Sequence, residues 1–322
     1  MTTLLLIAAL VLPVVYLLGF AGCTPFGAAI TPEPGTTLPG PPLVVQPDPQ
    51  PPIPPPEPAK TYDQIIRAEP NLVSYWRLGE LKTATSTAKD SAPNIPLDGT
   101  YINLQEGDTM KRAESGVLSQ AAATPVDPSD KAVEFLGSSG SVDVVYSALR
   151  NPPMAFSLEA WISTVEGQPN PQYVISSGTV TGDGTLARGY VLDIAFNNNI
   201  RARARLGMAA GAAIGPQIQL EFNLKDPSVQ QVIGNWWHLV MTFDGAAKKL
   251  TLFVNGQLRA TANVPGGNTF APAPAGTTLR IAHGPSPGSE AFNGKIDEVA
   301  FYNPPLTEAT VLKHFNAALV KG

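Results

Sequence analysis

The stretch that most constrains the fold runs from Trp236 to Ala262 and has the sequence WWHLVMTFDGAAKKLTLFVNGQLRATA. Its side chains alternate, so every second residue from Trp237 to Phe243 falls on one side, which is the two-residue period of a strand. The dipeptides Asp244-Gly245 and Asn255-Gly256 divide the stretch into three such runs and favour the positive backbone angles of tight hairpins. The stretch therefore predicts a three-stranded antiparallel meander whose apolar face must be covered by a second layer.

Further runs with the same alternation occur on both sides of this meander, at spacings typical of a β-sandwich. The predicted strands are 72–78, 132–135, 141–145, 156–163, 172–177, 190–196, 200–206, 217–222, 278–283 and 295–302. A short helical turn is expected at Thr61–Ala68. The apolar spacing between Leu306 and Leu319, with Thr307 available as N-cap, predicts one terminal helix that packs across an edge of the sandwich.

Four segments, in this order, resemble the laminin G-like domains of the concanavalin A-like lectin and glucanase superfamily. They are YWRLGE at residues 75–80, FSLEAWI at 156–162, the meander itself and GKIDEV at 294–299. The resemblance covers roughly residues 60–322 and implies a jelly roll. We therefore expect an all-β domain at 60–322: an antiparallel two-sheet jelly-roll sandwich with one short C-terminal helix.

Residues 1–22 are interpreted as a signal peptide or a membrane anchor, because nineteen uncharged and mostly apolar residues run from Leu4 to Gly22. The end of this segment, Phe20-Ala21-Gly22-Cys23, resembles a bacterial lipobox, in which the cysteine is lipidated and becomes the mature terminus. Phe20 stands where Leu is usual, and no Lys or Arg precedes Lys60. A lipidated Cys23, an uncleaved anchor and an ordinary cleaved signal therefore all stay open.

Residues 23–59 are expected to form a disordered Pro-rich linker. Thirteen prolines and no aromatic residue occur between Thr31 and Pro58, and such a composition favours extended polyproline II over a packed core. At about 3.1 Å per residue the segment would act as a stiff spacer. The alternative is a ligand for proline-binding modules.

The composition excludes several classes of function. The formal net charge is -5 and only 15% of the residues are charged, so we expect no nucleic acid as a partner. The single cysteine, Cys23, excludes an intrachain disulfide framework and a cysteine-rich metal site.

Catalysis is not expected. Glycoside hydrolases of the resembled superfamily use paired carboxylates, and the only close acidic pairs inside predicted strands are Asp297 with Glu298 and Glu134 with Asp143. Adjacent residues in a regular strand point to opposite faces, so Asp297 and Glu298 could not flank one bond.

The histidine and tryptophan residues are interpreted mainly as structural. His238 is expected to hydrogen-bond within its sheet, and neither His283 nor His314 has a His or Cys neighbour in sequence that would favour zinc. If the alternation holds, either Trp236 or Trp237 must face outward, while core packing is the default for both.

A structural calcium ion is implied by the resemblance, because many laminin G-like and lectin-like sandwiches carry one. Asp90 aligns with the acidic loop residue of the family, and Asp297 with the acidic residue of the Gly-x-Ile-Asp-Glu strand. The loop after Asp90 continues as Ala92-Pro93-Asn94, where the family usually has glycine and asparagine. The alternative is that Asp90 is a turn residue and Asp297 makes a buried hydrogen bond.

Three arginines alternate with apolar residues in the run Ile200–Leu206 and therefore project from one face of a single strand. Arg201, Arg203 and Arg205 would repel one another unless acidic neighbours or an anionic partner compensate. One interpretation is a solvated strand whose arginines discourage edge pairing. The other is a ligand-binding platform for an acidic glycan, since each guanidinium offers paired donors to a carboxylate or sulfate.

The preferred function is a non-catalytic, membrane-anchored, extracytoplasmic module that recognises a glycan or a surface glycoprotein. It would lie at the cell surface or outside the cell and meet the membrane through its N-terminal segment or a lipid. The alternatives are a structural protein of a phage virion or cell envelope, suggested by similar YWRLGE segments, and a remote glycoside hydrolase.

Overall fold

The computed structural model describes residues 60–319, except for residues 84–85, 121–125, 165–170, 197–198, 230–232 and 287–290. A compact unit spans Pro56–Gly322. The expected signal or anchor at 1–22, the linker at 23–59 and Cys23 lie outside the described residues. Within the described part of the chain, no helix combines the length and apolarity needed to cross a membrane.

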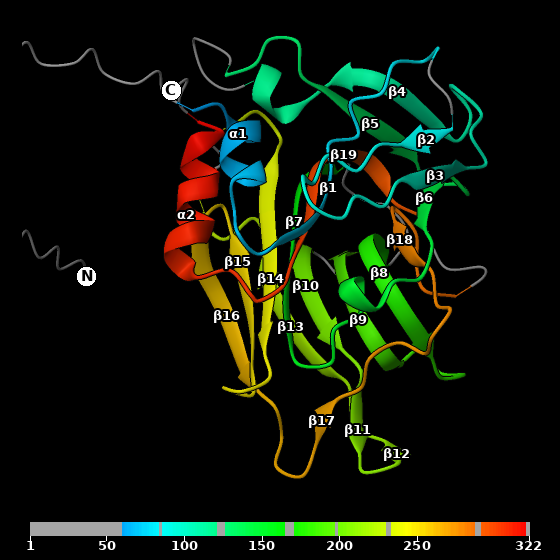
Figure 1. The fold of residues 1–322 in the computed structure, drawn as a ribbon, viewed down its shortest axis with the longest axis vertical. Helices are drawn as coiled ribbons and strands as arrows, with labels where there is room; N and C mark the ends of the chain where they lie inside the picture. The colour runs from blue at the N-terminus through cyan, green and yellow to red at the C-terminus, as the bar shows by residue number, and fades with distance from the viewer. Residues whose placement is uncertain are drawn as a thin grey trace, which may run out of the picture. The chain divides into compact units, whose positions relative to one another are not determined.

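Two eight-stranded sheets form the unit, and their strand pairings are antiparallel (Figure 1). The first sheet has the order β16 (Gln257–Asn263), β15 (Lys249–Val254), β14 (Trp237–Asp244), β7 (Ala155–Thr164), β19 (Asn293–Tyr302), β5 (Lys131–Leu136) and β4 (Met110–Ser115), with β1 (Leu72–Trp76) paired to β19. The second has the order β13 (Ile218–Asn223), β10 (Ile200–Leu206), β9 (Leu186–Phe196), β8 (Gln172–Val180), β18 (Leu279–Ile281), β6 (Ser141–Val144), β3 (Gly99–Ile102) and β2 (Thr87–Ala88). The predicted two-sheet sandwich is confirmed.

The smaller elements complete the fold. A three-stranded sheet has the order β12 (Ala213–Ile214), β11 (Met208–Ala210) and β17 (Thr269–Phe270). The helices are α1 (Tyr62–Arg67), α2 (Glu308–Ala317) and the single-turn 3₁₀ helices η1 (Val117–Ser119) and η2 (Ala148–Arg150). The helical turn expected at Thr61–Ala68 is therefore confirmed as α1.

The meander predicted from the sequence is confirmed as β14, β15 and β16. Its second turn uses Asn255 and Gly256 at φ 50° and 73°, as their residue types favour. The first turn differs from the prediction. Its left-handed residue is Lys248 at φ 52°, while the carboxylate of Asp244 accepts the amides of Ala246 and Ala247, both at 2.9 Å.

Both faces of the first sheet are covered. Its inner face packs against the second sheet in a large apolar core, and its outer face packs against α1 and α2 in a second core. Trp237 lies in the first core and Trp236 in the second, and both are buried. The alternation holds, but the expectation that one tryptophan faces outward into solvent is wrong, because the helices cover the outer face.

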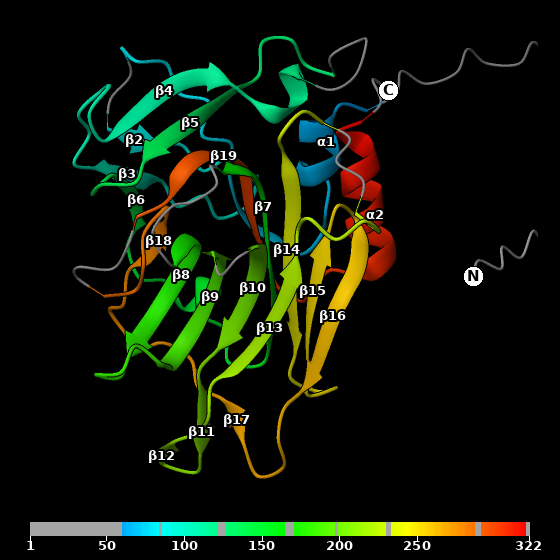
Figure 2. The ribbon, with the colours of Figure 1, turned by 180° about the vertical axis from the view of Figure 1, so that it is seen from behind.

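Helix α2 begins after Thr307, whose hydroxyl accepts the amide of Thr310 at 3.1 Å, so the predicted N-cap is confirmed. The helix packs on the outer face of the first sheet, where Phe315 stacks on Trp161 with ring centroids 5.8 Å apart. Packing across the edge of the sandwich, as predicted, is wrong. Figures 1 and 2 show both α-helices beside β14, β15 and β16, away from β8, β9 and β10.

Candidate functional site

Strand β19 contains a bulge that brings acidic side chains together. Its register against β7 shifts between Asp297 and Ala300, and Glu298 adopts φ 51°. Asp297 and Glu298 consequently join Asp130, which lies just before β5, and one oxygen from each carboxyl group lies within 4.8 Å of the others. The expectation that Asp297 and Glu298 point to opposite faces is wrong, because a bulge interrupts the alternation of a regular strand.

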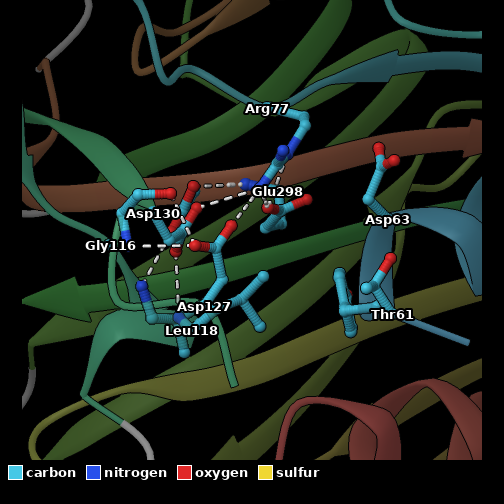
Figure 3. A network of polar contacts seen from close by, with 12 residues as sticks. Thr61, Asp63, Arg77, Gly116, Leu118, Asp127, Asp130 and Glu298 are labelled. Carbon is cyan, nitrogen blue, oxygen red and sulfur yellow. Dashed lines mark hydrogen bonds and ion pairs between the residues drawn. The ribbon is translucent and has the colours of Figure 1, made fainter. Parts of the chain in front are cut away.

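We call Asp130, Asp297 and Glu298 the acidic trio. Arg77, the residue after β1, extends its guanidinium to two of them, Asp130 and Glu298 (Figure 3). Its Nε lies 3.0 Å from Glu298, and its Nη2 lies 3.1 Å from Asp130. In the part of the chain that the structure describes, no other cation pairs with the trio. The three acids are buried, whereas the Arg77 side chain is 30% exposed.

Protein donors satisfy every oxygen of the trio. The partners other than Arg77 are the amide of Leu118 at 2.9 Å from Asp130, the amides of Val117 at 2.8 Å and of Glu298 at 2.9 Å from Asp297, and the hydroxyl of Tyr75, which donates to Glu298. Gly116 leaves the space for this arrangement, since a Cβ there would lie 2.2 Å from an oxygen of Asp130 and 2.6 Å from one of Asp297.

The environment of the trio favours neutral carboxyl groups. Burial raises the pKa of Asp297 well above its ordinary value, and the charges of Asp130 and Glu298 raise it further. Burial also raises the pKa of Glu298 to about 8, although Arg77 acts in the opposite direction. Burial therefore favours the neutral form of Asp297 and Glu298, beside a guanidinium that contacts Glu298 and Asp130.

Asp90, the other calcium ligand implied by the resemblance, does not join Asp297. Its carboxylate accepts the amides of Tyr75, Ala92 and Leu97 at 2.8 to 3.0 Å and pairs with buried Arg150 at 3.2 Å. A calcium ion takes six to eight oxygen ligands, but the oxygens of Asp90 and of the trio are already hydrogen-bonded, and Arg77 brings a positive charge. This donor set does not fit a calcium ion.

The arginines of β10 project together, as predicted, and find acidic neighbours. Arg203 donates to buried Asp193 from Nε at 3.0 Å and from Nη2 at 2.7 Å, and Arg205 reaches the same carboxylate at 2.5 Å. Arg201 pairs with Glu221 at 3.0 Å. The exposure of the side chains falls from 35% at Arg201 to 15% at Arg203 and 6% at Arg205.

Planar polar groups surround these arginines on the outer face of the second sheet. In the register of β10 with β13, Arg203 lies opposite Glu221 and Arg205 opposite Gln219. The amide of Gln219 donates to Glu221 at 2.7 Å, and the guanidinium of Arg205 lies 5.5 Å from the ring centroid of Tyr173. We call Arg201, Arg203, Arg205, Gln219 and Glu221 the polar face.

A third polar network lies between the first sheet and α2, and sequence reasoning missed it. Buried Glu159 accepts from the Tyr302 hydroxyl at 2.6 Å, from His238 Nε2 at 2.7 Å and from His314 Nδ1 at 2.9 Å. The charge of Glu159 raises the pKa of His314, against the effect of burial. His238 bonds within the sheet, as predicted. The signal for this network was a lone acid, Glu159, in the apolar run FSLEAWI.

The second acidic pair considered from the sequence is not a pair. Glu134 lies on β5 of the first sheet and binds Lys111 at 2.9 Å. Asp143 lies on β6 of the second sheet, 3.5 Å from Arg280. These two carboxylates therefore cannot act on one bond.

Residues 136–312 match the family described as the concanavalin A-like lectin/glucanases superfamily. No curated protein matches the chain in sequence. Several solved structures resemble it in fold.

The ligand-binding domain of botulinum neurotoxin serotype D, in complex with N-acetylneuraminic acid, aligns with 80% of the chain at 12% identity and a TM-score of 0.51. The binding domain of botulinum neurotoxin DC, in complex with rat synaptotagmin II, aligns with 79% at 17% identity and a TM-score of 0.47. The alignments cover 52% of each neurotoxin chain, so this chain spans about half of their length. Domain 4 of an extracellular arabinanase from Geobacillus stearothermophilus, in complex with arabinotriose, aligns over 76% of this chain and 98% of its own, at 15% identity and a TM-score of 0.48.

Proposed function

Because the chain belongs to the concanavalin A-like lectin/glucanase superfamily, we propose that it is a non-catalytic glycan-binding module. The observation that carries the proposal is the polar face on β10 and β13. Guanidinium, amide and carboxylate groups lie side by side there, and the α-helices lie on the other sheet (Figure 2). Such planar groups offer the paired donors and acceptors that sugar hydroxyl groups use.

The charge of the polar face favours a neutral or weakly acidic glycan over a polyanion. Arg201 is balanced by Glu221, and Arg203 and Arg205 share Asp193. Only one positive charge therefore remains uncompensated among the three arginines. An acidic glycan, which the sequence alone suggested for these arginines, would gain little Coulomb attraction from such a face.

The acidic trio does not support the alternative of a glycoside hydrolase. Its three side chains are buried, and its oxygens are occupied by Arg77, by backbone amides and by Tyr75. A hydrolase needs two carboxyl groups that reach opposite sides of a bound glycosidic linkage. Assay of reducing sugar released from a polysaccharide panel tests this point, and we expect no release.

The proposal also includes a location at the cell surface, which rests on the N-terminal segments. An anchor or lipidated Cys23, followed by a Pro-rich spacer, would hold the module at the cell surface, where its partner is a glycan or a surface glycoprotein. Intact mass of the membrane-extracted protein tests the anchor. Loss of residues 1–22 with gain of acyl chains supports lipidation, and an unprocessed Met1 supports an uncleaved anchor.

A glycan array probed with the full chain tests the central proposal. We expect binding to neutral or weakly acidic oligosaccharides. Replacing the exposed Arg201 with Gln should weaken the strongest signal at least about fivefold, since hydrogen bonds to a charged group are worth roughly 1.5 to 3 kcal/mol. The matched control is Lys249→Gln on β15, outside the polar face. No binding to any glycan, or equal loss in both variants, would contradict the proposal.

A further inference from the structure

A polar cavity of about 290 Å³ lies beside Arg77, between the loop after β1 and the segment that leads into β5. Its lining includes three cationic and three acidic residues. The cationic residues are Arg77, Lys89 and Lys131, and the acidic residues are Glu80, Asp127 and Asp130. A count of charges alone therefore suggests a neutral cavity, but the hydrogen bonds of these groups differ.

Each acidic residue of the cavity already accepts hydrogen bonds from the protein, and the second oxygen of Asp127 lies 3.9 Å from Nη2 of Arg77. Glu80 accepts the amide of Lys89 at 2.7 Å and the hydroxyl of Tyr101 at 2.6 Å. One oxygen of Asp127 accepts both the amide and the hydroxyl of Ser129, at 2.9 and 2.7 Å. Asp130 belongs to the acidic trio and is satisfied there by Arg77 and Leu118.

The cationic groups, in contrast, keep free donors. Arg77 uses Nε and Nη2 for its carboxylate partners, and within the described residues its Nη1 meets no acceptor. The ammonium group of Lys131 likewise has no hydrogen-bond or ion-pair partner in the described part of the chain. Lys89 pairs outside the cavity with Asp98 at 3.0 Å. The cavity therefore offers more donors than acceptors.

We propose that this cavity binds a single acidic sugar unit, a uronic acid, with its carboxylate between Arg77 and Lys131. Both residues carry a full positive charge and free N–H groups, and such charge-assisted bonds are the strong ones. The volume is at the lower end of ligand cavities, which suits one sugar ring. Ser91, which also lines the cavity, offers a hydroxyl for the ring. The choice of a sugar rests on the proposed glycan-binding function, but the site is distinct from the polar face.

Calorimetric titration of the full chain with D-glucuronate, D-glucose and acetate tests the inference. We expect glucuronate to bind at least about tenfold more tightly than either of the others, because glucose lacks the carboxylate and acetate lacks the ring. Replacement of Lys131 with Gln should weaken glucuronate binding at least about fivefold, since it removes a charged donor. Lys131→Arg, which keeps the charge, should retain most of the binding, and Lys249→Gln should leave it unchanged.

The outcomes separate this inference from the proposed function. If glucuronate binds no better than glucose or acetate, or if Lys131→Gln binds as well as the wild type with an unchanged melting temperature, the cavity is not an acidic-sugar site. Loss of glucuronate binding in Arg201→Gln but not in Lys131→Gln would place acidic sugars on the polar face and overturn the inference. An empty glycan array with glucuronate binding retained would contradict the polar face and leave the cavity standing.

Discussion

The acidic trio and the polar face each gather three side chains of one charge, yet they resolve the repulsion in different ways. Asp130, Asp297 and Glu298 are buried, and among the residues that the structure describes only one cation, Arg77, pairs with them. The arginines of β10 meet two carboxylates, and their exposure rises from Arg205 through Arg203 to Arg201. The acidic trio is buried inside the fold, whereas the arginines of β10 become progressively more exposed to solvent towards Arg201.

The difference follows from what each group can do with a proton. A carboxyl group can stay protonated when burial disfavours its charge, so three of them can share one guanidinium. A guanidinium does not lose its proton in proteins. Three arginines can therefore lie on one face only if carboxylates pair with some of them and water solvates the others. The comparison supports a structural role for the trio and the proposed role of the polar face in recognition.

The largest loss of unfolding free energy is expected from Arg77→Met. The change removes the hydrogen bonds that Arg77 donates to buried Glu298 and Asp130, and hydrogen bonds from a charged donor of this kind are worth about 3 kcal/mol together. Chemical denaturation at pH 7 measures it. Arg77→Lys is the matched control, because it keeps the charge and loses only the planar fork. A loss below about 1 kcal/mol in Arg77→Met would show that the trio does not depend on its cation.

The pH dependence of stability should carry the signature of Glu298. Its folded pKa of about 8 lies above its ordinary value of 4.5, so between these values the folded state keeps a proton that the unfolded state has lost. Stability from this group is therefore greatest at low pH and falls as the pH rises towards 8. Glu298→Gln should remove this slope and gain stability relative to the wild type at alkaline pH, on the order of 2 kcal/mol. Parallel denaturation curves at pH 5 and pH 8.5 measure the difference, and an unchanged slope would contradict it.

Substitution of the arginines of β10 should cost less unfolding free energy, and the loss should decrease with the exposure of the arginine. Arg203→Gln takes a bidentate partner from buried Asp193 and should cost about 1 to 2 kcal/mol. Arg201→Gln breaks an ion pair that is about one-third exposed on both sides, and should cost less than about 0.5 kcal/mol. Thermal melts of the two variants compare them directly. Equal losses would mean that the burial gradient does not govern these pairs.

No effect is expected from calcium. If an ion bound only the folded state, a hundredfold excess over its dissociation constant would add about 2.7 kcal/mol of stability. Each oxygen of Asp90 and of the trio already accepts a hydrogen bond, and Arg77 and Arg150 place positive charges beside them. Melting temperatures with calcium and with a chelator should therefore coincide. A melting temperature that rises with calcium would contradict this expectation and support the metal site that the resemblance implied.

The sequence predicted the sandwich because most strands alternate regularly and Asn255-Gly256 dictates a hairpin. It did not predict β4, where charged side chains obscure the period and a shift between Lys111 and Glu114 interrupts the pairing. The acidic trio was missed for a related reason. The bulge at Glu298 is not encoded by a glycine, and the contact of Arg77 with Asp130 and Glu298 joins segments far apart in the chain.

The two tryptophans show a further limit of local reasoning. Alternation correctly places Trp236 and Trp237 on opposite faces of the sheet, but exposure depends on what covers each face. The covering helices, α1 and α2, come from the two ends of the domain. The arginine ladder was visible from its spacing alone, whereas its partners Asp193 and Glu221 required the register of the sheet.

The most direct test of the account is the affinity of two variants for the neutral glycan that the array selects. The account predicts that Arg201→Gln binds this glycan at least about fivefold more weakly than the wild type, with a nearly unchanged melting temperature. It also predicts that Arg77→Lys, although destabilised, binds the glycan as the wild type does. The reverse result, with binding lost in Arg77→Lys and retained in Arg201→Gln, would contradict the division between a structural centre and a recognition face.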